Sequence, residues 1–173
     1  YQDYKFEKGM EEPSASNVDP YVNLSTDLTN ALTLNAGIRL NNNSEYGSNV
    51  LYKINPSYLI PLSEENYLKL FGSYSTAFVV PSLFQLFADF FGNENLEAEE
   101  TESLEFGLSL YLGDQLTFNL EYFDRTEINA IDFVSQFDNQ GNFIGGNYDN
   151  VTGDREIDGI EMDLNWQVSE ALN

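Results

Sequence analysis

Apolar and polar residues alternate along most of this chain, and this period of two restricts the possible fold more than any other feature. In Leu32–Leu40 the even positions are apolar and the odd positions are polar or small. A strand with one apolar face gives this pattern, because successive side chains point to opposite faces. The alternation recurs along Ser103–Leu112, Leu116–Phe123 and Ile160–Val168, and more weakly along Val22–Leu28, Val50–Leu62 and Leu68–Phe78. We therefore predict about seven strands, most of them near the ~9–11 residues with which a tilted strand crosses a bilayer.

The connections between these strands alternate in length. Three are short, namely Thr29–Ala31, Ser63–Asn66 and Gly113–Gln115. Three are long, namely Asn41–Asn49, Pro81–Thr101 and Gln136–Arg155. In an up-and-down meander all short turns then lie at one end and all long loops at the other, as in bacterial outer-membrane barrels. The pattern predicts an all-β, antiparallel up-and-down transmembrane β-barrel, of which this chain supplies a partial barrel.

Charged residues are absent from the central part of each predicted apolar face. Where they occur on that face, as at Asp124, Glu156 and Asp158, they lie toward the long loops. Tyr74, Phe78 and Tyr122 are expected at the outer interface, and Tyr58 and Trp166 nearer the inner one, because amphipathic rings prefer interfaces. The odd face would line the lumen, with the charged residues Asp27, Arg39, Lys53, Lys69, Glu105, Glu121, Arg125, Glu161 and Asp163. These charges either pair with a protein domain inside the lumen or line a solvated wall.

A soluble β-sandwich is the main structural alternative, because its strands alternate as well. In a sandwich the apolar face would be a protein core instead of a lipid-facing surface. Long loops at one end only are unusual in a sandwich. The loop lengths and the aromatic positions therefore favour the barrel.

Composition excludes several classes of function. With 7 basic and 29 acidic residues the net charge is -22, so the chain has no basic footprint for nucleic acid. The absence of Cys and His excludes disulfides, zinc thiolate sites, Cys nucleophiles and His general bases. A glycosidase needs two carboxylates at a defined separation across a cleft, and no pair in the sequence is singled out in this way. We predict that the chain is not an enzyme and has no catalytic residue or cofactor.

Acidic residues between positions 94 and 102 raise the alternative of a structural cation site. The residues concerned are Glu94, Glu97, Glu99, Glu100 and Glu102, with a second group at Asp138, Asn139, Asp149, Asn150 and Asp154. Calcium needs about six to eight oxygen ligands held in a defined geometry, and the spacing fits no EF-hand loop. A run of charge is more often a solvated surface, so metal binding stays undetermined.

A series of short motifs runs from Ser73 to Gly107 in a fixed order. Ser73-Tyr74-Ser75-Thr76-Ala77-Phe78 precedes Pro81-Ser82-Leu83 and Gln85-Leu86, and then come Gly92-Asn93-Glu94-Asn95-Leu96-Glu97-Ala98-Glu99 and Glu105-Phe106-Gly107. This series resembles the barrel domain of TonB-dependent receptors. There a strand ending in Ser-Tyr-x-Thr-x-Phe leads into Pro-Ser-Leu and Gln-Leu. A Gly-Asn-x-x-Leu-x-x-Glu segment follows, and then a strand with Glu-x-Gly.

Further matches keep this order over residues 36 to 161. They are Ala36-Gly37-Ile38-Arg39, Tyr46-Gly47, Asn55-Pro56-Ser57-Tyr58, Tyr122-Phe123-Asp124-Arg125, Tyr148-Asp149-Asn150-Val151 and Gly159-Ile160-Glu161. The set is most similar to the cobalamin-receptor-like branch. Two positions depart from the family pattern, because Val79 stands where a basic residue is common and Ala98 where a Pro is common. These departures concern the loop conformation and not the fold.

The resemblance implies the rest of the expected receptor. Such receptors close about 22 strands around an N-terminal plug in the outer membrane of a Gram-negative bacterium. They import a scarce nutrient, such as cobalamin or a siderophore, with energy from the TonB complex acting through the plug. The expected partners are therefore outer-membrane lipid, the receptor's own plug, TonB and a small nutrient ligand. The alternative function is a soluble or surface-exposed β-sheet domain that binds glycan.

We expect residues 1–173 to be a fragment of the barrel domain, without the plug or the barrel ends. The chain starts at Tyr1 without an initiator Met or a signal peptide, and it ends at Leu172-Asn173 without a terminal aromatic strand. No plug or TonB-contacting segment is recognisable. The chain therefore resembles the later middle of a receptor barrel.

The two longest predicted loops contain the candidate substrate contacts. Aromatic faces beside amide groups suit a ligand with both apolar and polar surface, and long loops often carry function. We expect Phe84 and Phe87 to pack inward as loop core. The predicted substrate-binding residues are Phe90, Phe91, Asn93, Tyr148 and Asn150.

Overall fold

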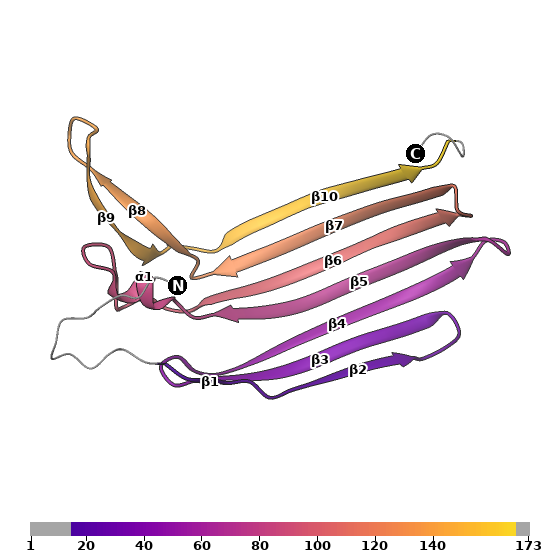
Figure 1. Cartoon of the computed structure of the whole chain (residues 1–173), viewed down its shortest axis with the longest axis horizontal. Coiled ribbons are helices and arrows are strands. Elements are labelled where there is room, and N and C mark those ends of the chain that lie inside the picture. The colour runs from indigo at the N-terminus through magenta and orange to yellow at the C-terminus, as the bar shows by residue number, and fades with distance from the viewer. Residues whose placement is uncertain (1–14, 169–173) are drawn as a thin grey trace.

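The computed structural model describes residues 15–168 and forms one long, curved antiparallel sheet with a group of loops at one end (Figure 1). The seven main strands are β2 (Tyr21–Asp27), β3 (Leu32–Asn43), β4 (Gly47–Pro61), β5 (Asn66–Val79), β6 (Glu99–Leu112), β7 (Leu116–Ile128) and β10 (Arg155–Trp166). The other elements are β1 (Asn17–Val18), the short helix α1 (Leu83–Phe87), and the hairpin strands β8 (Ile131–Phe137) and β9 (Phe143–Asn150). The prediction that the chain is a fragment of a barrel domain used Tyr1 and Leu172-Asn173, and these residues lie outside the described residues.

The main strands are neighbours in chain order, and each is antiparallel to the strand before it. This order confirms the predicted up-and-down sheet of about seven strands. Two connections are long: residues 80–98 join β5 to β6, and residues 129–154, which contain the β8–β9 hairpin, join β7 to β10. The sheet is open among the described residues, with β10 at one edge and β2 and β1 along the other.

The register keeps even and odd residues on separate faces throughout the sheet. Leu34 lies opposite Pro56, Leu70 opposite Leu108, and Leu120 opposite Met162. Every pairing between main strands joins even to even and odd to odd positions. Because side chains alternate between faces, the even residues from β2 to β10 share one surface. The predicted separation into an apolar even face and a polar odd face is confirmed.

The even face is apolar, and no protein layer covers it in the part of the chain that the structure describes. Met162 is 72% exposed, and Ile38, Phe106 and Ile160 are also exposed. A contiguous apolar surface of this extent is unstable in water and requires an apolar solvent or partner. The soluble β-sandwich alternative is wrong for residues 15–168, because no second sheet packs against this face.

The boundary between apolar and charged residues runs obliquely across the even face. The last apolar residue before the loops is Leu40 on β3 but Ile160 on β10, and the register places Ile160 in the row of Leu34. The boundary thus shifts by six residues, from position 40 to position 34, over the five steps from β3 to β10. With about 3.3 Å per residue and about 4.8 Å between strands, this shift corresponds to a strand tilt of about 40°. Transmembrane barrels have strand tilts of about 35–45°.

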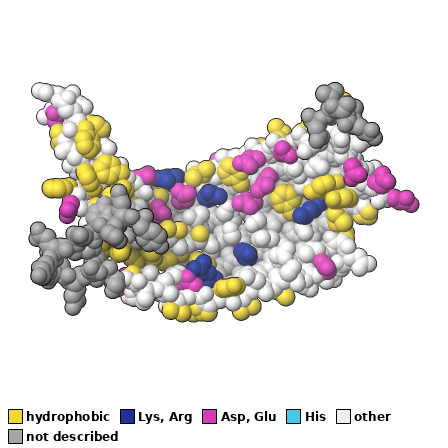
Figure 2. Space-filling model, viewed as in Figure 1, with side chains coloured by type: hydrophobic (Ala, Val, Ile, Leu, Met, Phe, Trp, Pro, Cys, Tyr) yellow, Lys and Arg dark blue, Asp and Glu magenta, His cyan; other side chains and the backbone are white. Residues whose placement is uncertain are grey.

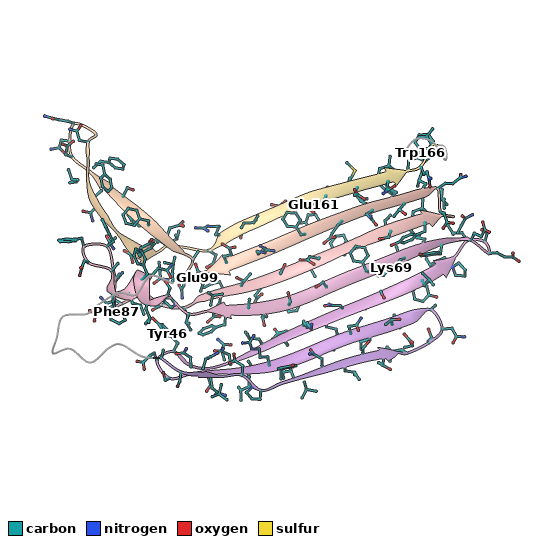
Figure 3. The ribbon with its side chains drawn as sticks, in the orientation of Figure 1. Tyr46, Lys69, Phe87, Glu99, Glu161 and Trp166 are labelled. Atoms are coloured by element: carbon teal, nitrogen blue, oxygen red, sulfur yellow. The ribbon has the colours of Figure 1, made fainter. Side chains whose placement is uncertain are left out.

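Aromatic side chains lie near both limits of this band. The Tyr52 and Tyr74 rings are 5.8 Å apart, and those of Phe106 and Tyr122 are 5.1 Å apart, on the side of the long loops. Trp166 lies at the opposite end of the sheet (Figure 3). The even face therefore has the aromatic borders expected of a surface that crosses a membrane.

One predicted long loop is instead a tight turn. β3 extends to Asn43 and β4 begins at Gly47, so the expected loop Asn41–Asn49 consists mostly of paired strand. The Asn43 side-chain oxygen accepts hydrogen bonds from the N–H groups of Glu45 (2.9 Å) and Tyr46 (3.1 Å), and Gly47 supplies the positive φ of 74° that closes the turn. The paired residues at this end of β3 and β4 are polar, so the sequence lacks the apolar alternation from which strands were predicted. The other two long connections, residues 80–98 and 129–154, lie at the same end, as predicted.

Candidate functional site

The two long connections, residues 80–98 and 129–154, pack together as one body, here called the loop unit (Figure 1). Ala88, Leu96, Ala98 and Ala130 are the buried hydrophobic residues of the described chain, and all four belong to the loop unit. Leu96 is only 3% exposed. The part of the molecule that has a water-excluding protein core is therefore the loop unit and not the sheet.

Local capping and a close backbone approach shape the first loop. Ser82 caps α1, because its hydroxyl accepts from the Gln85 N–H (3.2 Å) while Gln85 Oε1 accepts from the Ser82 N–H (2.8 Å). A Cβ at Gly92 would lie 2.6 Å from the Leu86 oxygen and 2.7 Å from the Ala88 nitrogen, so only glycine fits. Neither α1 nor any other helix among the described residues is long and apolar enough to cross a membrane.

Aromatic rings join the two loops. Tyr148 meets Phe84 with ring centroids 6.0 Å apart, and Phe133 lies edge to face with both Phe91 (5.7 Å) and Tyr148 (5.5 Å). The Tyr148 N–H donates to the Phe91 carbonyl (2.9 Å). The structure thus brings Phe91 and Tyr148 into one aromatic cluster, formed by Phe84, Phe91, Phe133 and Tyr148.

The predicted amide residues form hydrogen bonds between the loops. The Asn93 side chain donates to the Tyr148 carbonyl (3.0 Å). The Asn150 oxygen accepts from the Glu97 N–H (2.8 Å), while its nitrogen donates to the carbonyls of Glu97 (3.1 Å) and Asn129 (2.6 Å). In this structure both amides link protein groups, a role that the sequence did not reveal.

Charged groups fix the base of the β8–β9 hairpin on the sheet. Arg155, at the start of β10, forms ion pairs with Glu127 (3.2 Å) and with Asp132. The Glu99 carboxylate, at the start of β6, accepts from the Ile131 N–H (2.6 Å). These bonds hold the base of the hairpin, and β8 and β9 project from the loop end of the sheet (Figure 1).

The turn between β3 and β4 also contacts the loop unit. The Tyr46 hydroxyl donates to the Leu96 carbonyl (3.1 Å), and Tyr46 and Phe87 lie at the same end of the molecule (Figure 3). Burial, and then the neighbouring Glu45 carboxylate, raise the pKa of the Tyr46 hydroxyl. The Tyr46-Gly47 motif is visible in the sequence, but its partner lies 50 residues away.

Phe90 differs from the other aromatic residues of the loop unit. Its side chain is 96% exposed, and its backbone has a φ of 69°. Left-handed backbone costs about 1–2 kcal/mol in a residue with a side chain, and an exposed phenyl ring is unfavourable in water. Phe91, by comparison, is 39% exposed and packs on Phe133. Phe90 is therefore the predicted contact residue that is most accessible to a ligand.

The acidic groups considered for cation binding have other roles or remain apart. Within residues 15–168 no three acidic side chains converge as a metal site would require. Glu97 accepts from the Asn129 side chain (2.9 Å), and Asp138 accepts from the N–H groups of Gln140 and Asn142 (both 2.8 Å). The bonds from Asn142 are the main reason why the pKa of Asp138 lies below its usual value.

The odd face carries the basic side chains. Arg39, Lys53, Lys69, Arg125 and Arg155 are all at odd positions, and Figure 2 shows the Lys and Arg side chains spread over one face. Arg39 pairs with Asp19, whereas Lys53, Lys69 and Arg125 form no ion pair with any residue between 15 and 168. The Lys69 nitrogen lies 6.0 Å from the centre of the Phe71 ring. This polar face suits a surface covered by water or by another protein domain.

Comparison with known proteins identifies the family. Residues 8–173 match the family described as TonB dependent receptor-like, beta-barrel. The vitamin B12 transporter BtuB of Vibrio cholerae serotype O1 is 33% identical over 133 residues, which cover 75% of this chain and 19% of that protein. The chain thus spans about a fifth of the length of this relative.

Solved structures share the fold. The siderophore receptor PirA from Pseudomonas aeruginosa superposes with a TM-score of 0.74 and 23% identity, covering 90% of this chain and 32% of that one. The copper transporter OprC gives a TM-score of 0.70 and 20% identity, covering 90% and 27%. The family consists of outer-membrane transporters of Gram-negative bacteria and not of enzymes. Together with the oblique apolar band and the even–odd register, the match shows that this chain belongs to the TonB-dependent receptor family and forms part of its transmembrane β-barrel.

Proposed function

We propose that this chain is part of a receptor that imports a scarce nutrient, such as cobalamin or a siderophore, with energy from the TonB complex. One observation carries the proposal: a sheet with a lipid-facing surface bears, at its long-loop end, a packed loop unit with exposed aromatic side chains. A ligand that arrives from outside the cell meets that end first. BtuB, PirA and OprC, which this chain resembles, are named for vitamin B12, siderophores and copper.

In this proposal, residues 1–173 are a fragment of the barrel domain, and the odd face meets an N-terminal plug through which TonB acts. Glu121 lies directly opposite Glu161, and Glu105 is its diagonal neighbour on β6. Like charges on adjacent strands repel, so this group is more stable beside basic side chains. A plug that presents lysine or arginine at this height of the lumen would neutralise these three carboxylates.

The predicted contact residues divide into two groups in the proposed binding site. Phe90 is almost fully exposed, and in the aromatic cluster Phe91 is exposed and Tyr148 is half-buried. Asn93 and Asn150 contribute mainly by holding the loops together, because their amide groups bond to backbone atoms. Ligand contact therefore depends on the aromatic residues, and loop geometry depends on the amides.

The charge of the loop unit restricts the proposed ligand. The unit contains seven acidic residues and no basic residue, namely Asp89, Glu94, Glu97, Asp132, Asp138, Asp149 and Asp154. A cluster of negative charges repels negatively charged ligands, and salt screens this repulsion beyond about one Debye length, ~8 Å at physiological salt. A neutral or cationic ligand with apolar surface fits this unit better than an anionic ferric chelate does.

Binding to cells that display the full receptor tests the proposal. Phe90→Ala, Phe91→Ala and Tyr148→Ala are each compared with the wild type for binding of cyanocobalamin and of ferric enterobactin, with surface expression as the control. We expect weaker binding of one probe in at least the Phe90→Ala variant, by roughly 10-fold for an aromatic contact. Normal binding in all three variants at equal expression would place the ligand site outside this loop unit.

A further inference from the structure

The two loops of the unit leave the sheet at different places but are bonded to each other. Residues 80–98 connect β5 to β6, and residues 129–154 connect β7 to β10. Two long loops on a membrane barrel could move separately, because each has its own attachment to the rim. Here they are joined near the rim by Asn150 and farther out by Asn93 and the aromatic cluster.

Asn150 makes the most complete of these links. Its amide oxygen accepts from the Glu97 N–H, and its amide nitrogen donates to the Glu97 carbonyl, so the side chain pairs with both backbone groups of Glu97 as a neighbouring strand would. The same nitrogen donates to the Asn129 carbonyl at 2.6 Å. Only a side-chain amide has the required acceptor and donors side by side.

A second residue of the same loop, Asn129, also binds Glu97. Asn129 has a φ of 55°, which asparagine tolerates better than most residues, and its side chain donates to the Glu97 carboxylate (2.9 Å). Leu96, Ala98 and Ala130 are buried at this junction. Asn150 is half-buried beside this junction and Glu97 is exposed, so the polar bonds border the buried residues, and the bond to Asn129 is partly shielded from water.

We propose that Asn150 is a positioning residue that couples the two loops into one body, so that the aromatic cluster is a composite surface present only while this link is closed. Phe84 and Phe91 come from one loop, and Phe133 and Tyr148 from the other. Separation of the loops would remove every cross-loop ring contact. The consequence for a ligand rests on the proposed function, whereas the coupling itself does not.

The sharpest test exchanges Asn150 for aspartate in the full-length receptor. Asn150→Asp keeps the size and the bond from the Glu97 N–H but sets a carboxylate oxygen against two carbonyl oxygens. Of the two donated bonds that are lost, only the one to the Glu97 carbonyl crosses between the loops, because Asn129 belongs to the same loop as Asn150. Its loss, worth roughly a fivefold preference, should raise the population with separated loops by about 5-fold. Asn147→Asp is the matched control, because it places the same charge on β9 and the Asn147 side chain bonds only within the hairpin.

Spin labels at Asn95→Cys and Asn139→Cys, which are exposed positions on the two loops, report the separation as a distance distribution in the purified receptor. We expect a second, longer distance in Asn150→Asp and an unchanged distribution in Asn147→Asp. Asn150→Ala, which removes the bonds without adding charge, should show the same second distance. An unchanged distribution in both Asn150 variants, or an equal change in Asn147→Asp, would overturn the coupling.

Binding of cyanocobalamin and ferric enterobactin to the same variants separates the two proposals. Separated loops with weakened binding support both the coupling and the ligand site. Separated loops with normal binding of every probe that the wild type binds support the coupling and remove the loop unit from the ligand site. Loops that stay together in the Asn150 variants refute the coupling, whatever the binding result.

Discussion

The sheet and the loop unit are built for different solvents. On the sheet, large apolar side chains such as Ile38, Phe106 and Met162 are exposed, and within residues 15–168 no protein core covers the even face. In the loop unit, small buried residues and cross-loop hydrogen bonds produce a compact body. A lipid bilayer stabilises the first arrangement, because apolar side chains face it and the backbone groups of the inner strands pair with neighbouring strands, and water stabilises the second.

The difference teaches that burial has to be judged against the surrounding medium. If the exposed side chains are assumed to face water, the sheet is predicted to be unstable and the loop unit is predicted to be the core of the molecule. The oblique apolar boundary reverses this conclusion, since it matches the tilt at which strands cross a bilayer. Each prediction below therefore affects one region and leaves the other intact.

The largest effect is expected from a charge on the lipid-facing surface. Leu34→Arg places a guanidinium near the middle of the apolar band and should cost about 2–4 kcal/mol of the free energy of folding in the intact receptor. Asn35→Arg, one residue along the same strand, faces the odd side and should cost much less. Unfolding titrations in lipid vesicles measure both values. Equal penalties would contradict the assignment of the two faces.

A methyl group at Gly92 should damage the loop unit alone. The added Cβ would lie under 3 Å from backbone atoms of Leu86 and Ala88, so Gly92→Ala should destabilise the loop by about 1–3 kcal/mol, as overpacking does. At Gly72 in β5 the corresponding contact, with the Glu105 oxygen, is an ordinary 3.6 Å.

Protease cleavage within residues 80–98 measures the loop, and the thermal transition of the barrel measures the sheet. Gly92→Ala should increase cleavage without moving the barrel transition, and Gly72→Ala should change neither. A barrel transition lowered by Gly92→Ala would mean that the loop unit is part of the cooperative unit of the sheet.

The sheet could be predicted from the sequence because its signal is local. Alternation along Leu32–Leu40 and Ser103–Leu112 fixes which residues share a face, and a one-residue slip would reverse every side chain. The prediction failed at Asn41–Asn49, where polar pairs extend the strands beyond the apolar band. A ladder of backbone bonds needs no apolar residue once it has left the membrane.

The loop unit could be predicted only in outline. The alternating connection lengths correctly indicated that both loops lie at one end, and Phe91 and Tyr148 do come together. The links made by Asn93 and Asn150 have partners 55 and 53 residues away, and no local pattern encodes such pairs. The hairpin formed by β8 and β9 also escaped notice, because its strands lack regular alternation of polar and apolar residues.

A smaller effect is expected at the contact between the β3–β4 turn and the loop unit. The neutral Tyr46 hydroxyl donates to Leu96, and its pKa is raised above the usual value of 10.0. The folded state therefore keeps this proton at a pH where the unfolded turn loses it. The stabilisation is complete below about pH 10 and is lost as the pH rises through the folded pKa.

The mobility of a spin label at Asn95→Cys measures this contact. Mobility should rise at alkaline pH in the wild type, while Tyr46→Phe should raise it at every pH, at a cost of about 1 kcal/mol for one hydrogen bond. If Tyr46→Phe kept the same alkaline change, another group would be titrating.

The smallest effect concerns the tip of the β8–β9 hairpin, which lies farthest from the sheet. Asp138 accepts from the Asn142 side chain (3.0 Å) and from two backbone N–H groups, which lowers its pKa from the usual 3.8. A lowered pKa contributes stability that is present above pH 3.8 and is lost as the pH falls through the folded pKa. A spin label at Asn139→Cys should therefore gain mobility in acid, whereas Asp138→Asn should show little dependence on pH. The hydrogen bonds given for Asp138 all lie within residues 138–142. The barrel transition and the cross-loop distance should therefore follow the same pH dependence in Asp138→Asn as in the wild type. A shift of either one specific to Asp138→Asn would show that the tip of the hairpin is coupled to the rest of the molecule.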